Sequence, residues 1–518
     1  IYYEKINLDS HKISYKDTGL FSQLIIDYLD QKKDLDQYIS YFPNEENFLK
    51  QIKTKSNNDI DRVLLQNIVK EQNSFLELSE ICNANIEALK SKNTFSVTTG
   101  HQLCLFTGPL YFIYKIASTI NLVNRLKNNY PKYNFVPVFW LASEDHDFEE
   151  INSINLFNKQ VKWDSNQSGA VGRMKLDGIS STIAEIKKIL GTSDNAKKLI
   201  DIFQKSYNED NNLSQATRIL INELFGKYGL LIIDGDDILL KQKISEIIDH
   251  DINDSRFYNI IKKSNEKISV KYHSQAYVRP INFFRLSEKD RVRVTEKEDV
   301  ETINKNPEIF SPNVLIRPIY QEMILPNIAY VGGGSELSYW FQLYDTFKDL
   351  SLPMPILVMR NSVVLLDSKK QNKIKKLSLD RLDFFEDIHH INKKYILKNS
   401  HKIYLNEELI RMKEIFQSIK EKIEDPSLIS SLNAIEKKNN NMIADFENKV
   451  IKNLKSKNEI QINQILKIKN DFFPNKKLQE RHDSFIPQYV KYGDNFIKNI
   501  IFHLNPLDTN FVILNLEN

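Results

Sequence analysis

Hydrophobic and polar positions follow a helical period over residues 18–92, where few Gly or Pro residues interrupt the pattern. The positions that we expect to share apolar faces are Leu24, Ile25, Tyr28 and Leu29, and farther along Val63, Leu64, Ile68 and Leu76. The pattern therefore predicts an N-terminal helical segment, residues 1–92, packed on the rest of the protein.

A strand–helix–strand unit is predicted next. Residues 95–99 are short and β-branched and precede Gly100, as expected of a strand that ends in a tight turn. Residues 109–127 return to helical spacing, and residues 134–142 are nearly all apolar. Such a run fits a strand buried on both faces of a parallel sheet. The three segments together predict a βαβ unit.

The remainder of residues 93–367 alternates predicted strands with predicted helices. Further strands are expected at residues 230–234, 313–316, 355–359 and 363–366, and one near the end of the chain at 511–514. Helices are expected near residues 180–205, 214–227, 238–250 and 336–349. Residues 159–178 and 268–296 alternate polar and apolar side chains and could be small antiparallel insertions. This order predicts an α/β fold with a doubly wound parallel core.

Two heptad segments lie within residues 368–470, which are almost wholly helical in pattern. The first predicted seam consists of Leu409, Met412, Phe416, Ile419 and Ile423, and the second of Leu428, Leu432, Ile435, Asn439, Met442 and Phe446. A break at residues 424–427 predicts an antiparallel helical hairpin, a natural surface for a homodimer. Asn439 occupies a seam position. It either fixes the register of the helices or the choice of partner helix, or it faces solvent at a point where the helices pack loosely. Residues 471–518 are expected to return to the core.

Composition narrows the class of protein. The 518 residues are 41% hydrophobic and 27% charged, as in ordinary globular proteins, and can bury a large core without disulfides or a structural metal. The net charge of +3 gives no argument for nucleic acid or an anionic membrane as a partner. No run approaches the ~20 apolar residues of a membrane span, and the first residues do not resemble a signal peptide.

The chain has two cysteines, Cys82 and Cys104, and so few in a chain of this length favour a reducing compartment. We therefore expect a soluble cytoplasmic protein. Cys82 lies in an apolar helical stretch, and Cys104 is more typical of a packing residue than of a nucleophile, because nothing nearby in sequence would stabilise its thiolate.

The segment after the first predicted strand has the features of a phosphate-binding turn. Gly allows close backbone approach, and free N–H groups at a helix start favour an anion. His101 and Lys115 could add positive charge. The candidate nucleotide- or phosphate-binding residues are Gly100, His101, Gln102, Thr107, Gly108 and Lys115. The alternative is a Gly turn before a Pro-started helix, with Lys115 in solvent. No G-x-x-x-x-G-K-S/T motif occurs, so this is not a P-loop.

An acidic cluster directly follows the buried strand, with five carboxylates and one His within residues 143–150. Close like charges raise one another's pKa unless a cation is present, so the cluster suits an ammonium group, a metal or acid–base chemistry. The candidate catalytic residues are Glu144, Asp145, His146 and Asp147. The spacing matches no standard zinc or calcium loop, and we predict no metal site. A solvated acidic helix start is the alternative, above all for Glu149 and Glu150.

A third segment, residues 317–340, contains Arg317 and three successive glycines. Arg317 could hold a carboxylate or phosphate through two hydrogen bonds, and the glycines suggest close approach to a ligand. The candidate substrate-binding residues are Tyr111, Arg317, Gln321, Gly332, Gly333, Glu336 and Arg360. The alternatives are a surface ion pair for Arg317, a flexible turn for the glycines and a strand-to-strand turn at Arg360.

Four motifs together resemble the cysteine-adding enzyme family of bacillithiol biosynthesis (BshC). They are TTGHQLCLFTGPLYFIYKIAS, PVFWLASEDHDFEEIN, RPIYQEMILPNIAYVGGGSELSYW and FFPNKKLQER, and they cover most of the chain in the expected order. Family members commonly carry Gln where this chain has His101. The resemblance implies a Rossmann-type core like that of class I aminoacyl-tRNA synthetases and nucleotidyltransferases, with a coiled coil used in dimerisation.

The resemblance also implies a reaction, the joining of the cysteine carboxyl group to the amine of glucosaminyl-malate. Amide formation needs an activated carboxyl group, most simply activated by ATP with Mg²⁺. The phosphates would then lie near Gly100 and Lys115, Asp145 and its neighbours would bind or deprotonate an amine, and Arg317 would hold malate carboxylates or a phosphate. An adenylate and an acyl phosphate both remain open as the intermediate. The rival functions are a non-catalytic nucleotide-binding dimeric scaffold and a metal-dependent hydrolase.

Overall fold

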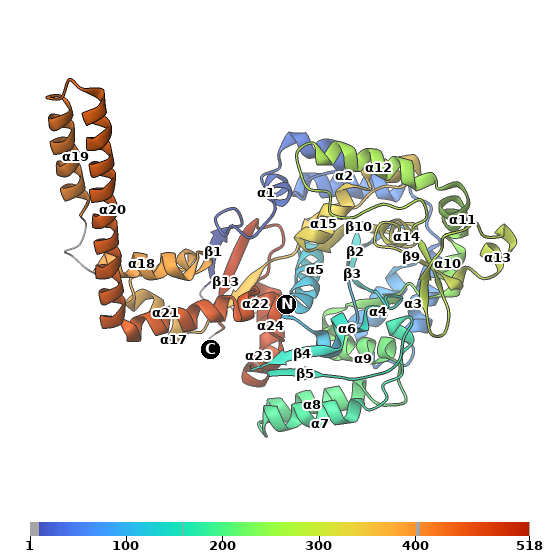
Figure 1. The fold of residues 1–518 in the computed structure, drawn as a ribbon. Coiled ribbons are helices and arrows are strands. Elements are labelled where there is room, and N and C mark those ends of the chain that lie inside the picture. Colours follow the sequence, from blue (N-terminus) through green and yellow to red (C-terminus); the bar gives the residue numbers. More distant parts are fainter. Residues whose placement is uncertain (1–9, 158, 400–404, 517–518) are drawn as a thin grey trace. The chain divides into compact units, whose positions relative to one another are not determined.

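A computed structural model describes residues 10–157, 159–399 and 405–516 (Figure 1). The chain forms two compact units, one built from residues up to Val364 together with Gln479–Leu516, the other from Leu365–Leu478. Two predictions concern segments outside the described residues. One is that residues 1–4 do not begin a signal peptide, and the other is that residues 400–404 are helical.

The first unit is built on a five-stranded sheet in the order β11-β10-β2-β3-β6, with every neighbouring pair parallel. Its strands are β2 (Thr94–His101), β3 (Asn134–Leu141), β6 (Leu231–Asp234), β10 (Asn327–Gly332) and β11 (Ile356–Met359). The chain extends the sheet from β2 through β3 to β6, then returns to the other side of β2 with β10. Strand order therefore reverses between β2 and β10, where ligands bind in open α/β sheets. The predicted Rossmann-like α/β class is confirmed.

Helices cover the buried strands of this sheet. Helix α5 (Leu110–Asn129) packs on β2 and β3, and α2 (Glu45–Ser56) packs on β10. Side chains from these elements, such as Phe48, Val97 and Leu122, form one fully buried cluster. The other helices of the N-terminal region are α1 (Gln23–Leu29), η1 (Lys33–Tyr38), α3 (Arg62–Gln72) and α4 (Glu80–Ala88). Ile68 is buried as predicted, but Val63 is 59% exposed, because α3 turns Leu65 and Val69 inward together with Ile68.

The predicted strand at residues 313–316 is wrong. The side chain of Asn313 accepts hydrogen bonds from the backbone N–H groups of Leu315 and Ile316, which bends the chain into α14 (Arg317–Ile324). The true strands are β9 (Phe310–Pro312) before this turn and β10 after it. β10 lies in the middle of the sheet and is buried throughout, although no strand was predicted before the glycines in which its short run ends.

Two antiparallel additions interrupt the core near the predicted segments 159–178 and 268–296, although one strand of each lies outside the predicted bounds. β4 (Ser153–Leu156) pairs with β5 (Lys159–Lys162), and β7 (Phe283–Leu286) lies between β8 (Arg291–Arg293) and β9. The helices that connect these additions to the core are α6 (Phe148–Ile151), η3 (Val171–Arg173), α7 (Ile179–Leu190), α8 (Asp194–Ser206), α9 (Leu213–Phe225), η4 (Gly226–Tyr228), α10 (Ile238–Gln242), α11 (Ser245–Asp254), α12 (Arg256–Ser269), α13 (Val300–Lys305) and η5 (Pro307–Ile309).

The C-terminal segment returns to the first unit. Strand β13 (Asn510–Leu514) pairs antiparallel with β1 (Ser10–Ser14) in a small sheet that also contains β12 (Val363–Leu365). The remaining elements of this unit are η2 (Leu105–Thr107), α15 (Gly334–Phe341), α16 (Tyr344–Asp349), α22 (Gln479–His482), α23 (Ile486–Tyr492) and α24 (Asp494–His503). Helix α22 packs on α5 and so brings a distant part of the sequence to the core sheet.

The second unit contains the predicted helical hairpin, formed by α19 (Asn406–Lys420) and α20 (Pro426–Lys457) (Figure 1). Its other elements are α17 (Ser368–Lys376), η6 (Leu382–Phe385), α18 (Ile388–Asn399), α21 (Glu459–Phe472) and η7 (Pro474–Lys476). Phe416 is buried, and Leu432 and Asn439 are partly covered. The other predicted seam residues of α20 are not buried in the hairpin; the exposed ones are Leu428, Ile435, Met442 and Phe446. No helix within the described ranges is long and apolar enough to cross a membrane.

Candidate active site

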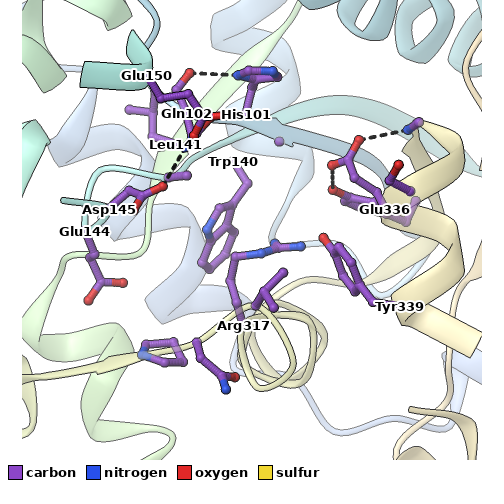
Figure 2. Close-up of a pocket in the computed structure, with 18 of the residues that line it drawn as sticks. His101, Gln102, Trp140, Leu141, Glu144, Asp145, Glu150, Arg317, Glu336 and Tyr339 are labelled. Atoms are coloured by element: carbon purple, nitrogen blue, oxygen red, sulfur yellow. Dashed lines mark hydrogen bonds between the residues drawn. The ribbon is translucent and has the colours of Figure 1, made fainter. Parts of the chain in front are cut away.

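A cavity of about 700 Å³ opens at the carboxyl ends of β2, β3 and β10 (Figure 2). Strand order reverses at this edge of the sheet, so the cavity lies where the fold favours a ligand. The predicted site residues that line it are Gly100, His101, Gln102, Tyr111, Lys115, Glu144, Asp145, Arg317, Gly333, Glu336 and Arg360. Segments widely separated in the sequence therefore converge on one site.

Several predicted site residues do not line this cavity. Thr107 and Gly108 form the turn into α5, where a Cβ on Gly108 would stand 2.6 Å from Cys104 Cβ. The backbone at Gly108 has φ of +63°, so glycine serves the turn and its packing. Gln321 is fully buried and hydrogen-bonds Glu322 and Arg317. Gly332 ends β10 beside the ring of Tyr330.

Two members of the predicted acidic cluster also lie outside the lining. His146 is exposed, and its Nδ1 lies 3.2 Å from Arg291. Asp147 is exposed at the start of α6, where its side chain caps no backbone N–H. The chain turns directly after β3, so of the four candidate catalytic residues only Glu144 and Asp145 face the cavity.

The side chain of Gln102 joins two carboxylates on one side of the cavity. Its amide nitrogen donates to Asp145 at 2.8 Å and to Glu150 at 2.9 Å (Figure 2). Burial alone would raise the pKa of Asp145, but the hydrogen bonds from Gln102 and from the backbone of His146, with the nearby charge of Arg291, lower it. Asp145 is thus held ionised. Glu150, expected as a solvated helix residue, lines the cavity as well.

Glu144 lies deeper in the same wall and faces a cation that the sequence pattern did not reveal. The ammonium group of Lys241 is 2.5 Å from its carboxylate and 3.4 Å from that of Asp236. Asp236 in turn forms a two-bond pair with Arg173, each bond 2.7 Å long. Burial raises the pKa of Glu144, and Lys241 opposes that shift. A carboxylate with a raised pKa in a cavity is a candidate general base.

Lys115 is buried on the opposite side, so the alternative interpretation, a lysine in solvent, is wrong. Its ammonium group lies 2.6 Å from Glu336 and 2.8 Å from the carbonyl oxygen of Gly100. Glu336 also accepts hydrogen bonds from the backbone of Gly333 and the hydroxyl of Tyr330. Burial would raise the pKa of Glu336, but Lys115 and the backbone N–H of Gly333 together outweigh it and lower that pKa to about 2. Lys115, which lies on α5, thus links the carbonyl oxygen at the end of β2 to the start of α15.

His101 cannot supply the positive charge that the sequence suggested. Burial lowers the pKa of its imidazole to about 3, so the ring is neutral at physiological pH. Its Nδ1 lies 3.0 Å from the carbonyl oxygen of Gln102, and the ring packs against Tyr111 and Phe112. Burial also raises the pKa of the Cys104 thiol, to about 12, which agrees with a packing role.

The two predicted arginines have different surroundings. Arg360 is buried and forms two hydrogen bonds with Glu480 of α22, at 2.7 and 3.0 Å, so it is neither exposed nor part of a simple turn. The guanidinium group of Arg317 points toward Tyr339 (Figure 2) and hydrogen-bonds Gln321 at 3.0 Å. Within the described residues no carboxylate lies within ion-pair distance of Arg317, which leaves its charge available to an anionic ligand.

Many cavity residues were not predicted as site residues, some inside the recognised motifs and others far from them. They are Trp140, Glu150, Tyr277, Arg279, Phe284, Arg291, Arg293, Asn313, Tyr330, Tyr339 and Arg481, with Lys241 behind the wall. The polar–apolar alternation around Arg291 and Arg293 indicated a strand, but no local signal indicated which residues it would face. Among the residues described, no group of three or more His, Cys, Asp or Glu side chains is arranged to hold a metal ion.

Comparison with known protein families identifies matches over nearly the whole chain. Residues 8–361 match the family described as "Bacillithiol biosynthesis BshC, N-terminal Rossmann-like domain", and residues 363–516 match "Bacillithiol biosynthesis BshC, C-terminal coiled-coil domain". Relatives named "Putative cysteine ligase BshC" include one from Flavobacterium psychrophilum, 39% identical over 97% of this chain and 98% of the relative. Another from Christiangramia forsetii is 40% identical, again over 97% of this chain and 98% of the relative.

Among solved structures, a chain described as a "putative arginyl t-RNA synthetase" from Campylobacter jejuni aligns at 13% identity, with a TM-score of 0.22. The alignment covers 86% of this chain and 99% of that one. So low a score supports no conclusion about fold or activity.

Proposed function

The chain belongs to the bacillithiol biosynthesis BshC family, and on that premise we propose that it is a ligase that joins the carboxyl group of cysteine to the amine of glucosaminyl-malate. The observation that carries the proposal is the pairing of carboxylates on one side of the cavity with Arg317 on the other. Glucosaminyl-malate has an amine and carboxylates that must be recognised together. Cysteine must have its ammonium group held while its carboxyl group reacts.

The carboxylates supply the amine side of this recognition. Asp145 is kept ionised by Gln102, so it can bind an ammonium group through a charge-assisted hydrogen bond. Glu144 is the better base, because its pKa is raised by burial while Lys241 keeps it within reach of ionisation. In the proposed reaction the glucosamine ammonium loses a proton to Glu144. The free amine then attacks the activated carboxyl carbon of cysteine.

Arg317 supplies a positive charge that can bind the carboxylate or phosphate groups of the substrates. A guanidinium group binds a carboxylate or a phosphate in the same two-bond geometry, so Arg317 suits a malate carboxylate or a phosphate of the activating nucleotide. Arg360 is less available, because Glu480 already occupies two of its nitrogens. We therefore assign substrate binding to Arg317 and a mainly structural role to Arg360.

Carboxyl activation requires an energy source, and ATP with Mg²⁺ is the proposed one. Lys115 is engaged by Glu336, so it acts by positioning the end of β2 and the start of α15 and not as a free phosphate ligand. No motif of the chain chooses between an adenylate and an acyl phosphate. The nucleotide products distinguish the two, since an adenylate route releases AMP and pyrophosphate whereas an acyl-phosphate route releases ADP and phosphate.

We also propose that the protein is a homodimer through its coiled-coil hairpin. Leu428, Ile435 and Met442 are spaced by seven residues and exposed on α20, and Phe446 extends the same face. An apolar stripe at heptad spacing is typical of a helix that packs against another helix.

Formation of the product thiol by purified protein from cysteine, glucosaminyl-malate, ATP and Mg²⁺ tests the proposed function. Loss of product when Glu144 is changed to Gln, with the fold retained, would connect the activity to this cavity. Full activity of that variant would refute the assigned base.

A further inference from the structure

The carboxylates and the arginines that line the cavity differ in whether they have partners within the protein. Each lining carboxylate already has a partner in the protein: Lys241 for Glu144, Gln102 and Arg291 for Asp145, Gln102 for Glu150 and Lys115 for Glu336. Several lining arginines, by contrast, lie within 4 Å of no carboxylate in the described part of the chain. They are Arg279, Arg293, Arg317 and Arg481. The cavity thus carries positive charge that the protein itself does not neutralise.

Two of these arginines belong to the inserted antiparallel sheet and the segment before it. Arg293 lies on β8 with its guanidinium carbon 4.7 Å from the centre of the Phe284 ring, and Arg279 lies 5.4 Å from the ring of Tyr277. Partial burial lowers the pKa of Arg293, and the charge of Arg279 lowers it further, so the two cations are close enough to repel each other. An anion between them would relieve that repulsion.

The neighbouring contacts hold this part of the sheet in place. Arg293 pairs in register with Phe284, which in turn pairs with Ser311 of β9. Arg291 bonds Ser311 and the carbonyl oxygen of Pro312, stacks on Phe284 at 3.9 Å and lies 3.7 Å from Asp145. The strand that carries Arg293 is therefore anchored to the wall of the cavity before any ligand binds, which lowers the entropic cost of binding.

We propose that Arg279 and Arg293 form a second anion subsite in the cavity, separate from Arg317, for a ligand group with two or more negative charges. A polyphosphate and a dicarboxylate share this chemistry. The subsite follows from the arrangement of charge alone. Its assignment to the nucleotide phosphates or to the malate group rests on the ligase function proposed above.

Calorimetric titration of the purified protein with two probes, Mg²⁺-free tripolyphosphate and malate, distinguishes these sources. Arg279→Gln and Arg293→Gln should each weaken binding of one probe about 10-fold or more and reduce the dependence of affinity on salt. Weaker tripolyphosphate binding assigns the subsite to phosphates, and weaker malate binding assigns it to the dicarboxylate. Both arginines are exposed, so these variants should keep their melting temperature.

Arg285→Gln is the matched control, because Arg285 lies on the adjacent strand β7 and pairs with Glu298 at 2.5 Å outside the cavity. It should leave both affinities unchanged. The subsite is refuted if neither probe binds the native protein, if neither arginine variant weakens binding, or if the control weakens it equally. A protein that binds a probe in the expected way but forms no product would leave the subsite intact and refute the ligase function instead.

Discussion

The ammonium nitrogen of Lys241 lies 2.5 Å from the carboxylate of Glu144, and the side chain of Lys241 is completely buried behind the cavity wall. Lys241 comes from α10, which follows the edge strand β6, whereas Glu144 directly follows β3. Two neighbouring strands thus place a buried cation beside the proposed general base. The positive charge of Lys241 opposes the effect of burial on the pKa of Glu144, so this carboxyl group can still ionise.

Changing Lys241 to Met should move the acidic limb of the pH–activity profile to higher pH. Burial raises the pKa of Glu144, so activity that needs its carboxylate is lost as pH falls through that raised value. Removing Lys241 removes the charge that opposes the shift, and each further pKa unit costs about 10-fold in activity at low pH. Kinetics across a pH series measures the limb.

Lys241→Arg keeps the charge and should retain most of the native profile. A ¹³C NMR titration of labelled Glu side chains, with Glu144→Gln to identify the signal, reports the same shift without any activity. An unchanged Glu144 titration in Lys241→Met would contradict the role given to this lysine.

Asp145→Asn should lower kcat/KM about 100-fold or more while leaving the fold intact. The amide cannot supply the negative charge that the proposed ammonium contact requires, although it can still accept a hydrogen bond from Gln102. Glu149→Gln is the control, since Glu149 belongs to the same acidic run but pairs with Lys162 at 3.3 Å away from the cavity. Equal activities of the two variants would remove Asp145 from the site.

Glu480→Gln should destabilise the protein by about 3–5 kcal/mol, because it leaves the buried charge of Arg360 without its partner. Glu480 also accepts a hydrogen bond from the backbone of Val363. The exposed pair of Lys159 and Glu185 gives the comparison, and Glu185→Gln should change stability by no more than about 0.5 kcal/mol. Denaturant unfolding of both variants measures the difference; similar midpoints would show that the buried pair does not hold the C-terminal segment.

Ile435→Asp combined with Met442→Asp should convert a dimer into a monomer, because charge on the exposed heptad face opposes its burial against a second helix. Asn433→Asp with Ala444→Asp adds the same charge to the opposite side of α20 and should leave the mass unchanged. Light scattering after gel filtration gives the mass. A native protein that is already monomeric would contradict the proposed dimer surface.

The parts of the fold that the sequence predicted have strong local patterns. β2, α5 and β3 are each defined by an uninterrupted period or apolar run, and the structure has them within a few residues of the predicted bounds. β10 was missed because its apolar run is short and passes directly into glycines, a combination that also suits a turn. Its place in the centre of the sheet comes from its neighbours and not from its own sequence.

In the candidate site, too, residues with a strong local pattern were predicted and their partners from distant segments were not. Gly100 and Asp145 could be identified because strand ends in a parallel sheet gather ligands. The partners that determine their chemistry could not be, since Lys241, Arg291 and Glu480 contact the site only through the folded arrangement of distant segments. For the same reason the neutral state of His101 and the pairing of Lys115 with Glu336 were not predictable from residue type.

The most direct test of the proposed ligase is a mass-spectrometric assay of the purified protein with cysteine, glucosaminyl-malate, ATP and Mg²⁺, in which each component is omitted in turn. We expect a product thiol that requires all four, with AMP and pyrophosphate or ADP and phosphate formed in equal amount. Absence of product from well-folded protein that binds its substrates, or product formation that does not depend on ATP, would contradict nucleotide-dependent joining of cysteine to glucosaminyl-malate.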